Sequence, residues 1–89
     1  MNEEKRAEVR KWLIKSQHDL GSAGRLLEGD KPYLDTAVYH CQQAAEKALK
    51  AFLTYHDIEF EKSHDLTELV TLSMTVEPAF ERWREVAEE

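Results

Sequence analysis

The chain has 89 residues, of which 42% are hydrophobic and 34% are charged, and its formal net charge is −6. This size allows one domain spanning residues 1–89. No apolar run approaches the ~20 residues of a membrane span. The acidic balance disfavours a general nucleic-acid-binding surface, which needs clustered Lys and Arg, although it leaves room for a small local site. The polar start, Met-Asn-Glu-Glu-Lys-Arg, predicts no secretion signal and therefore a cytoplasmic protein.

The first predicted element is a helix over residues 4–28. Its apolar positions recur at helical spacing, and they are Val9, Trp12, Leu13, Leu20, Ala23 and Leu27. Ile14 falls outside this stripe, so it is either a lone exposed isoleucine or part of a contact surface. Gly21 and Gly24 each weaken the helix by about 1 kcal/mol relative to alanine. We expect close packing against another helix in return.

A short connection then separates the first helix from the second. Gly29 suits the left-handed end of the first helix. Asp30 is expected to cap the second helix, with Pro32 in its first turn, where no backbone donor is needed. The second helix should continue to Tyr55 or His56. Such a short connection predicts two antiparallel neighbours.

The alanine-rich second helix has an unusually wide apolar arc. At about 100° per residue, more than half of its circumference is covered by Ala37, Val38, Cys41, Ala44, Ala45, Ala48, Leu49, Ala51, Phe52 and Leu53. A helix packed on one neighbour needs a narrower stripe. We therefore expect the domain core on one side and a second copy or another protein on the other. Cys41, the only cysteine, should be a buried small apolar side chain and forms no intrachain disulfide.

Two shorter helices are predicted after a polar link. Ser63 is the expected cap of the third helix, whose buried side is predicted to contain Leu66, Leu69, Val70 and Met74. The fourth helix, after a break at residues 75–78, should carry Val76, Phe80, Trp83 and Ala87 on one face. No segment alternates with period two, so no strand is predicted. The expected fold is all-α, an antiparallel four-helix bundle of two long helices followed by two shorter ones.

Four features over residues 8–75 together resemble the HEPN domain family. They are Trp12-Leu-Ile-Lys-Ser-Gln-His-Asp-Leu20 with Ala23, Tyr33 before the second helix, Ala37-Val-Tyr-His-Cys-Gln-Gln-Ala-Ala-Glu-Lys-Ala-Leu-Lys50, and Ser63-His-Asp-Leu66 with Leu69. The Gln-Gln-Ala-Ala-Glu-Lys-Ala-Leu-Lys string is the most specific. Members of the family usually continue through a further helix with an Arg-Tyr-Pro element that is not found here, so the chain is either naturally short or a shortened version of a longer bundle.

The resemblance implies a helical homodimer, in prokaryotes often encoded beside a minimal nucleotidyltransferase partner in a toxin–antitoxin-like system. It also implies nucleotide binding, and in some branches metal-independent ribonuclease activity. The ribonuclease branch carries an arginine and a histidine separated by four to six residues. The nearest pair here, Arg10 and His18, has seven residues between its members. We therefore expect no catalytic residues.

Two sets of side chains are candidate sites. His40, Gln43, Lys47, Lys50 and His64 would line a groove for a phosphate or nucleotide; the alternative is a solvated helix face. The candidate interface residues are Ile14, Gln42, Leu49 and Leu53, of which Gln42 lies on the apolar edge and needs a partner. No metal-ligand motif occurs, and no cofactor is expected beyond a nucleotide ligand.

Three function classes follow. The favoured one is a non-catalytic HEPN-type module that dimerises and binds a nucleotidyltransferase partner, a nucleotide, or both. The alternatives are a metal-independent ribonuclease toxin and a plain structural helical bundle.

Overall fold

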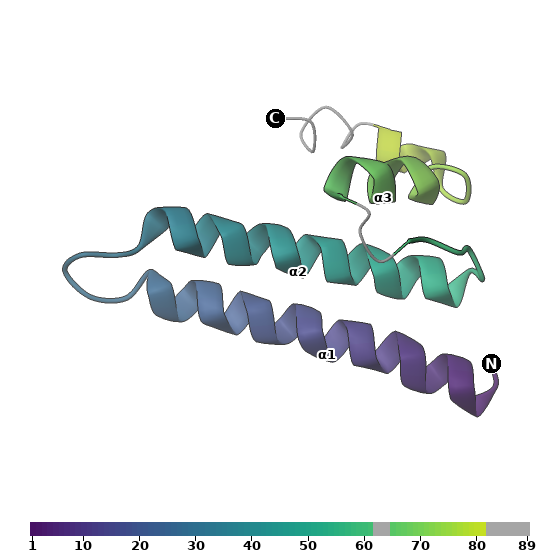
Figure 1. Cartoon of the computed structure of the whole chain (residues 1–89), viewed down its shortest axis with the longest axis horizontal. Coiled ribbons are helices and arrows are strands. Elements are labelled where there is room, and N and C mark those ends of the chain that lie inside the picture. Colours follow the sequence, from purple (N-terminus) through teal and green to yellow (C-terminus); the bar gives the residue numbers. More distant parts are fainter. Residues whose placement is uncertain (62–64, 82–89) are drawn as a thin grey trace.

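The computed structural model describes residues 1–61 and 65–81 and is helical, with no strand in these ranges. Its elements are α1 (Glu3–Leu26), α2 (Leu34–Tyr55), α3 (Leu66–Ser73) and a short 3-10 helix, η1 (Pro78–Phe80). The two long helices form an antiparallel hairpin, and α3 lies against α2 on the side away from α1 (Figure 1). The predicted all-α class is confirmed. None of the helices in the described ranges is long and apolar enough to cross a membrane.

The first helix begins where the side chain of Asn2 accepts a hydrogen bond from the Lys5 backbone N–H at 2.7 Å. Such a cap satisfies one of the donors that the first helical turn leaves free. Acidic Glu3 and Glu4 follow in the first turn, where the positive end of the helix dipole favours negative charge.

The hairpin loop departs from the predicted capping pattern. Gly29 has a φ of +90°, which favours glycine, as expected. The predicted Asp30 cap is wrong, because α2 begins only at Leu34 and Tyr33 precedes it without a side-chain cap. Instead, the Tyr33 backbone N–H donates to the Leu26 carbonyl at 2.8 Å, which closes the loop by a main-chain bond.

A seam of alanines joins the two long helices. Ala37, Ala44 and Ala51 recur every seven residues along α2 and are 2–3% exposed, and Ala23 on α1 is 3% exposed. Small side chains at the contact allow the helix axes to approach closely. Ser16 on α1 is also buried, and its hydroxyl donates to the Ala44 carbonyl at 2.8 Å, so the polar group in the seam is satisfied.

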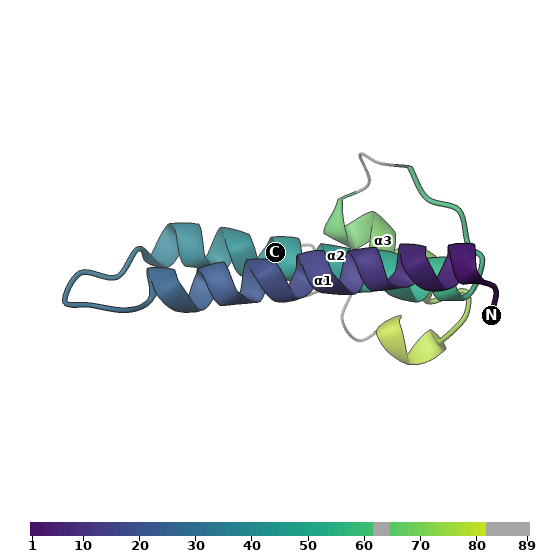
Figure 2. The same ribbon diagram turned by 90° about the horizontal axis from the view of Figure 1, so that it is seen from below.

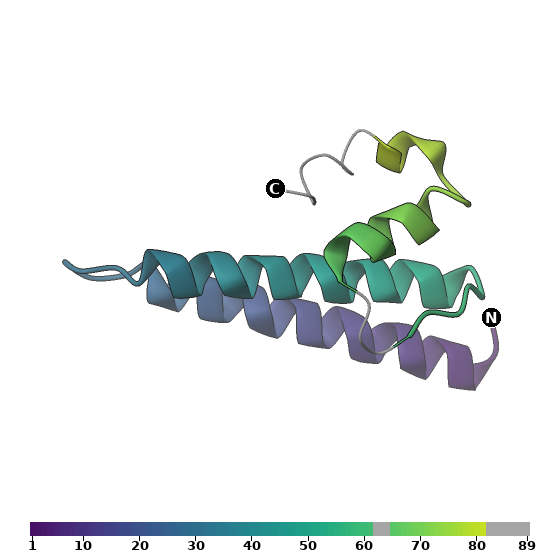
Figure 3. The same cartoon turned by 45° about the horizontal axis from the view of Figure 1, so that its top comes forward.

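The third helix covers only the C-terminal half of α2. It packs at an incline to the hairpin (Figure 3), and the loop end of the hairpin extends well beyond it (Figure 2). Leu53 of α2 and Leu69 of α3 are fully buried and supply the two largest apolar side chains of this part of the core. Val70 is buried as predicted, while Leu66 and Met74 are half-buried.

The start of α3 and the fourth helix differ from the predictions. Asp65, not Ser63, caps α3, with its carboxylate accepting from the Glu68 backbone N–H at 2.9 Å. Ser63 itself lies outside the described residues. Pro78–Phe80 forms a 3-10 turn, and Trp83 and Ala87, the later part of the predicted fourth helix, lie outside the described ranges. The structure therefore supports three α-helices over the described part of the chain and does not establish a four-helix bundle.

Two expectations for the hairpin are wrong within the protomer. A Cβ added to Gly21 or Gly24 would meet nothing within 4 Å, so no described helix packs closely there. Cys41 is exposed rather than buried, because it lies on the same flank of α2 as the exposed Ala45 and Ala48, about 120° around the helix from the buried Leu53.

Replacing Leu53 by alanine should lower the free energy of unfolding by about 2–5 kcal/mol, because it removes a fully buried side chain and leaves a cavity. Urea denaturation followed by circular dichroism measures this change. Ile14→Ala is the matched control, since Ile14 is 53% exposed, and it should change stability by less than about 1 kcal/mol. Equal effects of the two substitutions would contradict the placement of Leu53 in the core.

Candidate functional site

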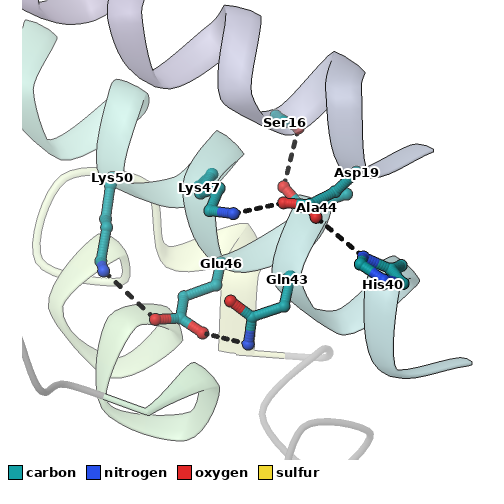
Figure 4. Close-up of polar contacts among 8 residues, drawn as sticks. All are labelled: Ser16, Asp19, His40, Gln43, Ala44, Glu46, Lys47 and Lys50. Carbon is teal, nitrogen blue, oxygen red and sulfur yellow. Dashed lines mark hydrogen bonds and ion pairs between the residues drawn. The ribbon is translucent and has the colours of Figure 1, made fainter. Parts of the chain in front are cut away.

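A polar cluster on one side of the hairpin brings α1 and α2 together. Asp19 on α1 lies between two side chains of α2 (Figure 4): the ring Nδ1 of His40, 2.9 Å from Asp19 Oδ1, and the ammonium of Lys47, which bonds the other carboxylate oxygen. Asp19 is only 7% exposed. A buried carboxylate is tolerated when it is paired and hydrogen-bonded, and both of its oxygens here have a partner.

The environment of Asp19 fixes its charge. Burial, the largest single influence, raises the pKa of the Asp19 carboxyl. The hydrogen bonds from Lys47 and His40, followed by their positive charges, oppose burial and leave the pKa below its ordinary value of 3.8. Asp19 is therefore an anion at neutral pH, and it links the two helices electrostatically.

A second set of polar contacts continues along α2 toward α3. The Lys50 ammonium donates to Glu46 Oε1 at 3.2 Å, and Gln43 Nε2 lies 3.5 Å from Glu46 Oε2 (Figure 4). Lys50 is only 6% exposed, and its ammonium lies 5.0 Å from the Trp12 ring centroid and 5.9 Å from that of Phe60. Aromatic faces favour a cation at such distances, so Lys50 is held inside the protomer.

The predicted nucleotide-binding residues that the structure describes are thus placed close together, but each is bonded to a carboxylate of the protomer. His40 and Lys47 share Asp19, while Gln43 and Lys50 share Glu46. His64 lies outside the described residues. A nucleotide at this cluster would have to compete with two internal carboxylates. Over the described ranges, no three His, Cys, Asp or Glu side chains converge as a metal site requires.

Sequence reasoning missed Asp19, the centre of this cluster. The residues of α1 that turn toward α2 include Trp12, Ser16, Asp19 and Ala23, which are spaced by four, three and four positions. This spacing is helical, but Ser16 and Asp19 are polar. A pattern based on apolar residues alone therefore includes Leu13 and Leu20 and leaves Asp19 out. A polar residue at an inward position is the signal that identifies Asp19.

The opposite side of the hairpin carries exposed apolar side chains from both long helices. On α1, Leu13, Leu20 and Leu27 are 47%, 55% and 50% exposed. On α2, Leu34 and Val38 are 60% and 57% exposed. Small exposed side chains complete the face, which we call the apolar face and define as Leu13, Leu20, Leu27, Leu34, Val38, Cys41, Ala45 and Ala48. At about 100° per residue, these positions lie on the side of each helix away from the Asp19 cluster.

The four interface residues predicted from the sequence have separate locations. Leu53 is fully buried in the core of the protomer, and Leu49 is half-buried. Gln42 is exposed beside Val38, at the edge of the apolar face, and has no side-chain hydrogen bond within the described residues. Ile14 is exposed but lies about 100° around α1 from Leu13, outside the apolar face.

A long antiparallel hairpin with a short helix against one arm places the protein among small all-helical domains. Residues 9–89 match the HEPN domain family, and the chain belongs to that family. No curated protein matches the sequence, and no solved structure does.

Replacing Asp19 by asparagine should destabilise the protein by about 1–2 kcal/mol at pH 7, because Lys47 and His40 both lose an ionised acceptor. The folded-state pKa of Asp19 is lowered, so its stabilisation is complete above the unfolded value of 3.8 and is lost as the pH falls through the folded value. The difference between wild type and Asp19→Asn should therefore shrink as the pH is lowered below 3.8.

Urea denaturation at a series of pH values measures this difference. Glu8→Gln, which removes the exposed Lys11–Glu8 pair of the same helix, is the control and should change stability by less than about 1 kcal/mol. A difference between wild type and Asp19→Asn that persists unchanged to pH 2 would show that the Asp19 charge is not responsible.

Proposed function

We propose that this protein is a non-catalytic HEPN module that acts by self-association through the apolar face of its α1–α2 hairpin. The observation that supports this proposal is the row of exposed leucines on α1, Leu13, Leu20 and Leu27. The exposed Leu34 and Val38 of α2 lie beside this row. Soluble monomers rarely leave contiguous apolar patches of more than a few hundred Å² in water. Burial of this patch against a partner would remove the unfavourable contact between these side chains and water.

The dimensions of the hairpin allow an interface of modest size. On α2 the apolar face runs from Leu34 to Ala48, which is about 21 Å. Two helices side by side are about 20 Å wide, so the apolar face covers about 400 Å² of one copy. Two copies would bury about 800 Å² through the apolar face alone and about 1,300 Å² if the whole length of α2, about 33 Å, were in contact. The second value reaches the range for specific protein–protein interfaces.

The chemistry of the apolar face favours a second copy of the chain as its occupant. The chain carries a net charge of −6, so most of its surface repels another copy. None of the residues that define the apolar face is charged. An isologous dimer requires a patch that is complementary to itself, and an uncharged patch meets this requirement. Face-to-face packing would also assemble four long helices into a bundle.

Family membership supports a second, heterologous partner. HEPN proteins in prokaryotes often pair with a minimal nucleotidyltransferase, and we include such a partner in the proposal. By helical rotation, the polar cluster around Asp19 lies on the side of the hairpin opposite the apolar face. It would therefore stay accessible to that partner, or to a nucleotide, in the homodimer.

Self-association is tested with one substitution on each helix of the apolar face, Leu20→Glu and Ala45→Glu. Sedimentation velocity at micromolar concentration should show a dimer for the wild type. Each variant should raise the dissociation constant of the dimer at least tenfold, because each buries a charge in an apolar contact. Both positions are exposed in the protomer, so the variants should retain their helical circular dichroism.

Ile14→Glu is the matched control, because it introduces the same charge at an exposed apolar position outside the apolar face. It should leave the dimer intact. A wild-type monomer at 100 µM, or a dimer disrupted by Ile14→Glu but not by Leu20→Glu, would contradict the proposed surface.

The non-catalytic part of the proposal rests on the absence of a suitably spaced arginine and histidine. The nearest such pair, Arg10 and His18, has seven residues between its members, outside the range of four to six. Extensively purified protein should leave structured and unstructured RNA intact in the presence of EDTA. Cleavage that persists through purification and is abolished by His40→Ala would favour the ribonuclease alternative.

A further inference from the structure

A row of basic side chains follows the outer side of α1. It consists of Lys11, Lys15, His18 and Arg25, and all four are exposed. Their spacings of four, three and seven residues place them on one side of the helix. We call this row the basic ridge. His18 lies about 140° around α1 from Leu13, so the basic ridge and the apolar face occupy different sides of the helix.

Two cations of the basic ridge, Lys15 and Arg25, are not neutralised locally, although the whole chain is acidic. Asp19 is the only carboxylate of α1 between Glu8 and Glu28, and Lys47 and His40 already hold it. Glu8 pairs with Lys11 at 2.7 Å. Lys15 and Arg25 have no ion pair within the described residues. Lys15, Arg25 and Lys47 together outnumber Asp19, which leaves an excess of positive charge along this side of the hairpin.

Two adjoining hollows follow the basic ridge and share His18. The first, about 380 Å³, is lined by Ile14, Lys15, His18, Asp19 and Lys47. The second, about 410 Å³, is lined by Gln17, His18, Gly21, Ser22 and Arg25. Each therefore contains a cation with no carboxylate partner. The second also holds the neutral hydrogen-bonding groups of Gln17 and Ser22, and it stays open at Gly21, where no atom lies within 4 Å of an added Cβ.

We propose that the basic ridge binds a linear chain of phosphates. From Lys15 to Arg25 the helix rises about 15 Å, which is too long for one inorganic phosphate and suits several consecutive phosphate groups. Lys15 and Arg25, cations without a carboxylate partner, supply the attraction. Gln17, His18 and Ser22 supply donors to phosphate oxygens. The hollows are shallow and follow the helix, so a ligand that fills both must be extended. The shared chemistry is the phosphate chain itself, from a single-stranded oligonucleotide or from inorganic polyphosphate.

This inference is independent of the proposed self-association, because the basic ridge does not include any residue of the apolar face. A failure of dimerisation is detected by sedimentation and a failure of phosphate binding by anisotropy. The two results can therefore be told apart in the same preparation.

The test is fluorescence anisotropy of a fluorescein-labelled 12-nucleotide oligouridylate with the full chain at 25 mM NaCl. Binding should weaken steeply as NaCl is raised to 200 mM, because phosphate neutralisation releases counterions. The double variant Lys15→Glu/Arg25→Glu should bind at least tenfold more weakly and show a smaller salt slope. Lys31→Glu is the matched control, since Lys31 is an exposed lysine of the hairpin loop, and it should bind within about twofold of the wild type.

Competition with unlabelled polyphosphate identifies the source of the phosphates. Displacement by polyphosphate at equal phosphate concentration indicates recognition of the chain alone, and displacement only by oligonucleotide indicates a nucleic acid strand; either result supports the basic ridge as the site. No binding at 25 mM NaCl, or equal binding by wild type and the double variant with unchanged helical circular dichroism, would overturn the proposal.

Discussion

The close approach of α1 and α2 along a seam of alanines is the constraint on which the rest of this structure depends. Ala37, Ala44 and Ala51 are almost completely buried against α1. Because their side chains are short, the polar groups beside the seam can reach across it. Ser16 reaches the Ala44 carbonyl, and Asp19 reaches both His40 and Lys47. Larger residues in the seam would separate the helices and break these contacts.

The same seam divides the hairpin into two chemically different sides. One side holds the Asp19 cluster, and the opposite side is the apolar face. Since a helix rotates about 100° per residue, one heptad-spaced seam leaves room on α2 for both sides. The wide apolar arc of α2 follows from this arrangement: part of it contacts α1, part contacts α3 through residues such as Leu53, and the remainder is exposed.

Much of the fold could be predicted from the sequence, because long helices with strong periodicity are determined locally. The two long helices, their antiparallel order and the buried positions Leu69 and Val70 were all predictable. The start of α2 was not, because the loop is closed by the main-chain bond from Tyr33 to Leu26, which has no side-chain signature. Asp65 was missed as a cap because Ser63 offered an equally good capping side chain two residues earlier.

The site was less predictable than the fold. His40, Gln43, Lys47 and Lys50 do lie together on α2, as their helical spacing predicts. Their pairing with Asp19 and Glu46 depends on how α1 is rotated against α2, and a single sequence does not specify that rotation. The exposure of Cys41 has a similar origin: it depends on which flanks of α2 are covered by α1 and α3, which is a tertiary property.

Because α3 covers only one half of α2, the two halves of this helix should differ in local stability. Backbone amides near Leu53 are protected by packing from two neighbours, whereas among the described elements only α1 supports the N-terminal half of α2. Opening of a helix usually starts where fewest tertiary contacts hold it. Hydrogen exchange along α2 should therefore become slower from the hairpin loop toward Tyr55. The loop end of the hairpin is then the part of α2 whose conformation a binding partner changes most easily.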